Sequence, residues 1–189
     1  MEYTTIKSNR RTLALEIKND KLVVRAPISA TDEEIKEFVL KHRRWIDKTF
    51  IKVENRKEKL QGIEPLSQSE IRALADLAMT VIPDRVKYYA KKIGVTYGRI
   101  TIRNQRTRWG SCSVKGNLNF NCILMLAPPE VLDSVVVHEL CHRKEMNHSD
   151  KFYTEVLRVF PDYWLWNKWL KYNGDILIKR MTGGSKDAV

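Results

Sequence analysis

The chain has 189 residues, of which 43% are hydrophobic and 30% are charged, and its formal net charge is +11. This is the composition of an ordinary soluble globular protein, with enough residues for one good core or two small ones. No run approaches 18 apolar residues, and the N-terminal segment 1–5 lacks the features of a secretory signal, so neither a membrane span nor export is expected. The three cysteines have no Cys-x-x-Cys spacing, which favours reduced thiols and a cytoplasmic location.

Residues 1–62 are expected to form a β-hairpin-rich region followed by a long helix. Alternating segments flank Asn19-Asp20, a dipeptide that signals a hairpin turn. Thr31 is suited to cap a helix with acidic residues in its first turn, and helical spacing of apolar residues carries this helix past Val53. The clearest break of the chain follows at residues 61–65, which contain Gly62 and Pro65.

Residues 63–178 are predicted to form a second domain, with a mobile tail at 179–189. Ser67 or Ser69 is expected to cap a long helix over about Glu70 to Ile93, in which Pro83 favours a kink. Two strands, an apolar helix introduced by Pro128-Pro129, and two shorter helices should follow, at 100–103, 118–122, 129 onward, 151–160 and 163–172. Trp164, Trp166 and Trp169 on the last helix are expected to be core anchors.

The apolar helix carries the motif His138-Glu139-Leu140-Cys141-His142, in a chain that has four histidines. Histidines four residues apart project from one face of a helix, since about 100° per residue brings position i+4 back near position i. Such a pair can hold one zinc ion, with the intervening glutamate beside the metal-bound water. The alternative is that both are partly buried helix histidines. Cys141 lies on a different face, and a small buried residue is the preferred interpretation over a ligand.

His148 can share a metal with this pair only if the helix ends soon after His142. In an unbroken helix it would lie about 240° around from His142 and about 9 Å further along the axis. We expect the helix to end near Lys144, because Arg143 and Lys144 suit a helix C-terminus and Asn147 tolerates the left-handed conformation. Ser149-Asp150 then reads as the cap of the next helix. The sequence thus predicts His148 in the corner between two helices, as a third ligand.

The stretch 106–170 resembles the YgjP-like zinc metallopeptidase family, a relative of the SprT and WLM groups within the zincins. The matching blocks are Arg108-Trp109-Gly110-Ser111-Cys112-Ser113, Asn119-Phe120-Asn121, Val136-Val137-His138-Glu139-Leu140-Cys141-His142, Asn147-His148-Ser149 with Phe152, and Phe160-Pro161-Asp162-Tyr163 with Trp166 and Trp169-Leu170. This resemblance implies an α+β fold in which a minimal zincin-like domain, a small sheet plus active-site helices, follows the N-terminal region.

The resemblance also implies a zinc-dependent peptidase with one Zn²⁺ per chain, held by His138, His142 and His148. Three protein ligands leave an open position for water, which is the arrangement of catalytic zinc sites. We expect Glu139 to take the proton of the zinc-bound water during attack on a peptide carbonyl, and to return it to the leaving amine.

The sequence indicates several candidates for residues that contact the substrate. Arg108, Asn121 and Tyr153 are candidates for the donor that stabilises the oxyanion. Trp109 belongs to a turn that either faces the site or forms a structural hairpin corner. In zincins of this type an edge strand can hold extended peptide by strand addition, and 118–123 is the candidate strand.

The segment from Arg85 to Lys115 contains nine basic residues and no acidic ones. It either forms solvated faces, the preferred interpretation, or attracts nucleotides or nucleic acid. Two further functions therefore stay open. One is a metal-dependent nucleoside-triphosphate pyrophosphatase, because some YgjP-like proteins are described as such. The other is a SprT-like nucleic-acid-associated protease. Three histidines favour zinc and carbonyl chemistry over magnesium and phosphate chemistry, and no phosphate-binding glycine loop is present.

Overall fold

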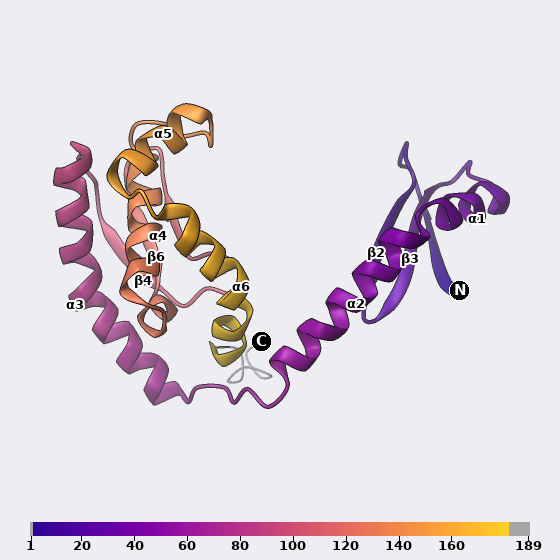
Figure 1. Ribbon diagram of the computed structural model, residues 1–189, viewed down its shortest axis with the longest axis horizontal. Coiled ribbons are helices and arrows are strands. Elements are labelled where there is room, and N and C mark those ends of the chain that lie inside the picture. Colours follow the sequence, from indigo (N-terminus) through magenta and orange to yellow (C-terminus); the bar gives the residue numbers. More distant parts are fainter. Residues whose placement is uncertain (1, 182–189) are drawn as a thin grey trace. The chain divides into compact units, whose positions relative to one another are not determined.

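The computed structural model describes residues 2–181 and divides into two compact units, one ending at Gln61 and the other beginning at Gly62 (Figure 1). Each unit combines helices with a small mixed sheet, so the fold class is α+β, as predicted. Among the described helices, none has the length and apolar character needed to cross a membrane. The predicted tail begins inside the last helix, which includes residues 179–181, and its remainder, 182–189, lies outside the described residues.

The first unit is built on a sheet of strand order β1-β3-β2, formed by β1 (Tyr3–Ser8), β2 (Ala14–Lys18) and β3 (Lys21–Pro27). The hairpin between β2 and β3 turns at Asn19 and Asp20, whose φ angles of 49° and 62° are left-handed, so the predicted turn is confirmed. Helix α1 (Asp32–Lys41) begins at Thr31 with a full capping box. Helix α2 (Arg43–Leu60) follows.

The single long helix predicted for the first unit is wrong, because the chain leaves helical geometry at His42. Its backbone angles are −101° and 14°, and its ring Nδ1–H donates to the Phe38 carbonyl oxygen at 2.8 Å. The two rings also pack, with centroids 4.3 Å apart. Apolar periodicity runs on through this point, so it does not reveal a break that depends on the local bonding of one side chain.

The second unit contains helices and a sheet of strand order β4-β6-β5. Helix α3 (Gln68–Ile93) begins with a capping box at Ser67 and ends at Gly94, whose φ is 78°. The helix continues through Pro83. The remaining elements are β4 (Ile100–Arg103), β5 (Gly110–Cys112), β6 (Leu118–Asn121), the 3₁₀ turn η1 (Cys122–Leu126), α4 (Pro129–Cys141), α5 (Asp150–Val159) and α6 (Tyr163–Met181).

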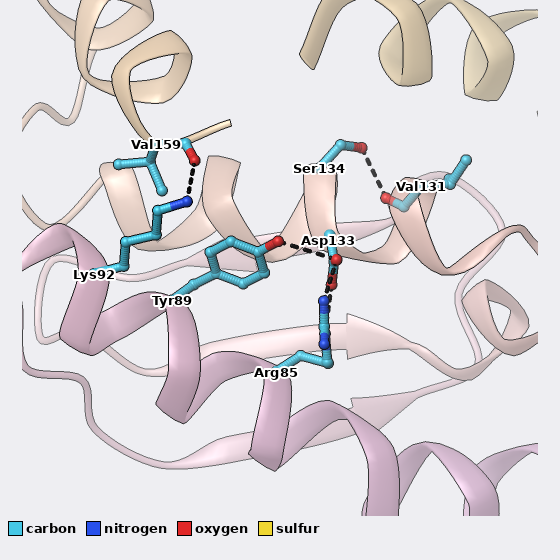
Figure 2. Close-up of polar contacts among 7 residues, drawn as sticks. All are labelled: Arg85, Tyr89, Lys92, Val131, Asp133, Ser134 and Val159. Carbon is cyan, nitrogen blue, oxygen red and sulfur yellow. Dashed lines mark hydrogen bonds and ion pairs between the residues drawn. The ribbon is translucent and has the colours of Figure 1, made fainter. Parts of the chain in front are cut away.

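Helix α4 lies at the centre of this unit and packs against both α3 and α6 (Figure 1). Ten of its residues are buried, which explains why its sequence is apolar nearly all round. A polar link ties it to α3: the buried carboxylate of Asp133 accepts hydrogen bonds from the Arg85 guanidinium and from the Tyr89 hydroxyl (Figure 2). The lateral position of α4, and of the motif it carries, is therefore fixed by α3.

Helix α6 is longer than the predicted segment 163–172, because it continues to Met181. The additional turns bury Leu177 and Met181 in the main core, and the Arg180 carbonyl accepts a 2.7 Å hydrogen bond from Leu66 N–H. Trp166 and Trp169 pack against the core as predicted, whereas Trp164 is 50% exposed and is not an anchor.

Candidate metal centre

The motif helix ends where the sequence required it to end. Helix α4 stops at Cys141 and His142 is its C-terminal cap residue, with φ −62° and ψ −14°. Hydrogen bonds from Arg143 N–H to Leu140 and from Glu145 N–H to Cys141 form a closing turn. Asn147 contributes differently from the prediction, because Asn19 and Asp20 are the non-glycine residues with positive φ in the described chain.

This turn returns the chain so that His148 lies beside His138 and His142. The side chain of Ser149 accepts from Phe152 N–H and begins α5 immediately afterwards. One ring nitrogen from each of the three histidines lies within 4.8 Å of the other two, and the Nε2 atoms of His138 and His148 are 3.0 Å apart. The three residues that the sequence predicted to meet are thus together at one point.

The outward-facing nitrogens of two of these rings have partners of their own. Nδ1 of His142 donates to the carbonyl oxygen of Glu145 at 3.1 Å, and Nδ1 of His138 lies 2.9 Å from the Tyr163 hydroxyl. The Phe152 ring, fully buried, packs against all three imidazoles with centroid distances of 4.6–5.0 Å. These contacts hold the rings in place and leave the Nε2 atoms of His138 and His142 for a ligand.

The electrostatics of the cluster suit neutral imidazoles. Burial lowers the pKa of His138 to about 3, and the charges that His142 and His148 would carry act in the same direction. Burial also lowers the pKa of His142. Because a metal ligand must be the unprotonated imidazole, such rings are ready for a cation without first losing a proton. Three nitrogen donors that converge on one point fit zinc better than magnesium or calcium, which prefer oxygen ligands.

Glu139 lies on the same helix, buried to 7% exposure, between the histidine cluster and strand β5. Burial raises the pKa of its carboxyl group to about 8, and the positive charge of Arg108 opposes this shift. Its neighbour on β5 is Gly110, where a β-carbon would come within 2.8 Å of both Cγ and Oε1 of the glutamate. Gly110 of the Trp-Gly-Ser-Cys-Ser block therefore leaves room for the Glu139 carboxylate, which a larger residue would not.

Strand β5 was not predicted, and its presence corrects the choice of edge strand. In the described part of the chain β5 pairs with β6 alone, whereas β6 pairs with β4 on one side and β5 on the other. Within the predicted segment 118–123, residues 118–121 therefore form the central strand of this sheet, which has no free edge, and residues 122–123 belong to η1. The strand with a free edge beside Glu139 is β5.

The remaining sequence candidates have different surroundings. Arg108 is exposed and borders two hollows that also contact His138 and Glu139, of about 190 and 290 Å³. The Trp109 ring packs close to Gly174 of α6 and also lines the smaller of these hollows, so both roles considered for it stay open. Asn121 does not face the site, because its amide donates to the carbonyl oxygens of Gln105 and Arg108 at 2.6 and 3.0 Å.

Tyr153 adjoins the cluster rather than lining either hollow. Its ring is stacked against His148, with centroids 6.2 Å apart, and contacts Trp164 at 4.9 Å. The larger part of its environment is thus aromatic. The role of oxyanion donor predicted for it stays a prediction.

Sequence reasoning missed Tyr163 and Asn167, which both line the smaller hollow. Asn167 Nδ2 donates to the Tyr163 hydroxyl at 3.2 Å, and burial raises the pKa of Tyr163 to about 12. Tyr163 belongs to the Phe-Pro-Asp-Tyr block that carried part of the family resemblance, so a signal was present without an assigned role.

Part of the basic segment is used inside the fold. Arg85 is paired with Asp133, and the Lys92 ammonium donates to the Val159 carbonyl oxygen at 2.9 Å. These two side chains link helices inside the fold, a role that neither interpretation of the segment included.

Comparison with known protein families identifies the family to which the chain belongs. The model of the YgjP-like metallopeptidase domain matches residues 11–74 and 64–173, which together span most of the chain. The chain belongs to the YgjP-like family. It is therefore a metallopeptidase, and family membership implies a metal ion, typically zinc, and peptide or protein substrates.

Two solved structures resemble this YgjP-like chain. The metallopeptidase zymogen abylysin of Pyrococcus abyssi aligns with 49% of the chain and 94% of its own length, at 21% identity and a TM-score of 0.44. The metallopeptidase zymogen jannalysin of Methanocaldococcus jannaschii aligns with 48% and 95%, at 24% identity and a TM-score of 0.41. None of the curated proteins compared matches the chain.

Proposed function

We propose that this chain hydrolyses peptide bonds at a single zinc ion held by His138, His142 and His148, with Glu139 as general base. The observation that carries the proposal is the convergence of three ring nitrogens within 4.8 Å, next to a buried carboxylate. When bound, zinc supplies Lewis acidity that acidifies water and polarises a carbonyl group. Three protein ligands leave a coordination position open for that chemistry.

Glu139 moves the proton in the proposed reaction. It accepts a proton from the attacking water at its carboxylate and returns it to the leaving amine. Burial stabilises the protonated form of this carboxyl group, while the charge of Arg108 favours the carboxylate, so the group is placed to hold either state. Arg108 borders both hollows at Glu139 and is our candidate for the donor that stabilises the oxyanion.

Strand β5 is the proposed binding edge for an extended peptide. On the side of β6, the Trp109 carbonyl oxygen accepts a hydrogen bond from Asn121 N–H, and Ser113 N–H donates to the Asn117 carbonyl oxygen. Gly110 and Cys112 alternate with the residues whose backbone groups bond to β6. In an antiparallel ladder, the backbone groups of the alternate residues point to the free edge. Gly110 and Cys112 can therefore pair with substrate backbone directly beside Glu139.

The experiment compares the wild-type chain with Glu139→Gln, loaded with zinc, on a peptide library and a nucleotide panel. Wild type should cleave peptides and lose this activity with a chelator, and Glu139→Gln should retain zinc but lose cleavage. The matched control is Glu130→Gln, the same change at an exposed position of the same helix, which should cleave normally. Chelator-sensitive hydrolysis of nucleotides without peptide cleavage would overturn the proposal in favour of a pyrophosphatase.

The ligand set has a separate test. His148→Ala should lower zinc content below one ion per chain in elemental analysis, since two imidazoles alone hold the metal weakly. An unchanged stoichiometry would remove His148 from the proposed centre.

A further inference from the structure

Tyr163 and Asn167 form a short hydrogen-bonded chain that ends on His138. The Tyr163 oxygen lies 2.9 Å from Nδ1 of His138, and Asn167, one helical turn further along α6, donates to the same oxygen at 3.2 Å. The tyrosine is 3% exposed, and its ring lies within 16° of parallel to the imidazole. The Tyr163 hydroxyl is therefore buried, faces His138, and is held in this position by Asn167.

This contact acts on the form of His138 that can bind a metal. Nε2 of His138 faces His148, and it can donate a lone pair only when the ring proton is on Nδ1. An Nδ1–H group buried here needs an acceptor. The phenolic oxygen has two lone pairs, so it can accept from Asn167 and from His138 at once. When the ring proton is on Nδ1, the phenolic oxygen is thus the acceptor within reach of it.

His142 provides an internal comparison, because its Nδ1–H donates to a backbone carbonyl. A carbonyl oxygen can only accept, and no side-chain substitution removes it. At His138 the same task falls to a side chain on another helix, 25 residues away in sequence. The orientation of the His138 ring therefore depends on a side chain that a substitution can remove.

We propose that Tyr163, braced by Asn167, is a positioning residue that fixes His138 as its Nδ1–H tautomer and thereby raises the metal affinity of the site. This inference rests on the metal centre proposed above. Partners that orient ligand histidines contribute about 10–100-fold to metal affinity in other proteins, which sets the size of the effect expected here.

The test measures zinc affinity by competition with a chromophoric chelator for wild type, Tyr163→Phe and Asn167→Ala. Tyr163→Phe keeps the ring and should weaken zinc binding about 10–100-fold, and Asn167→Ala should weaken it by a smaller factor. The control is Tyr88→Phe, which removes a hydroxyl from an exposed tyrosine of α3 and should leave the affinity unchanged. Should Tyr163→Phe fail to fold by circular dichroism, Asn167→Ala alone carries the test.

A second readout separates positioning from packing. In ¹⁵N NMR of the zinc-loaded protein, the His138 ring should show a protonated Nδ1 with a hydrogen-bonded shift, and Tyr163→Phe should change that shift while those of His142 stay in place. Equal zinc affinity and an unchanged His138 spectrum in both variants would overturn the inference and leave the metal centre standing. A wild-type chain that binds no zinc would instead overturn the centre itself.

Discussion

Gly110 and Glu139 lie so close that any side chain on the first would displace the second. A β-carbon at residue 110 would come within 2.8 Å of the carboxylate oxygen Oε1 and within 3.1 Å of the carboxyl carbon. Contacts under 3.0 Å require one of the partners to move, and Glu139 is buried on a helix packed on both sides. The position of the proposed general base beside the free edge of β5 therefore requires that residue 110 has no side chain.

Gly110→Ala should lower peptide hydrolysis at least 10-fold while zinc stays bound. The reason is geometric, since a displaced carboxylate no longer reaches the attacking water, and small misplacements of a reacting group are costly. Steady-state kinetics and elemental analysis on the same preparation check this expectation. Introduced into Glu139→Gln, the glycine substitution should reduce the residual rate no further, and a further reduction would mean that Gly110 acts through something other than Glu139.

Asn121→Ala should reduce both stability and activity, because the amide holds the segment that leads into β5. The change removes two hydrogen bonds to carbonyl oxygens and a longer one from Ile123 N–H, which together correspond to about 2 kcal/mol in the free energy of unfolding. Urea denaturation and peptide hydrolysis measure the two effects. Asn119→Ala, which loses one bond to Ser111 Oγ, is the matched control and should cost less. Loss of activity with full stability would contradict this structural role and indicate that Asn121 acts on the substrate.

Local signals in the sequence predicted those features of the fold that a few adjacent residues determine. Asn19-Asp20 tolerates the left-handed turn it occupies, and Ser149 caps α5 with its own side chain. The meeting of the three histidines followed from the helical repeat and from the need to end α4. Each of these predictions used residues that lie within about ten positions of one another.

What the sequence did not reveal depends on partners distant in the chain. β5 has three residues, too few to show alternation, and it exists because β6 pairs with it. An asparagine at position 121 has the same chemistry whether it faces a substrate or two backbone carbonyls. Tyr163 reaches His138 across 25 residues, through the packing of α6 on α4. Periodicity and spacing carry no information about such contacts.

Glu155 should make a pH-dependent contribution to stability. Hydrogen bonds from Arg158, and then from Lys144, lower its pKa to about 2 from an ordinary value of 4.5. A carboxyl whose pKa is lowered by folding stabilises the protein above its unfolded pKa, and this contribution is lost as pH falls from about 4.5 towards 2. Glu155→Gln should therefore be less stable by about 1 kcal/mol at pH 7. Thermal unfolding should show the gap to wild type closing below pH 4.5, and a constant gap would contradict the ion pairs as its cause.

Asp133→Asn should be the most destabilising of these substitutions. The carboxylate is 6% exposed, and it joins the central helix to α3 through Arg85 and the Tyr89 hydroxyl (Figure 2). The change weakens the charge-assisted hydrogen bonds that this buried carboxylate accepts from Arg85, whose own side chain is 39% exposed, and from Tyr89, at a cost of about 3 kcal/mol in the free energy of unfolding. Urea denaturation measures this cost against Asp84→Asn, an exposed position on α3 where the same change should cost under about 0.5 kcal/mol.

Replacing both Arg85 and Asp133 with apolar residues should cost less than the sum of the two single changes, because no unpaired charge remains. Strict additivity would show that the two side chains stabilise the helices independently rather than as a pair.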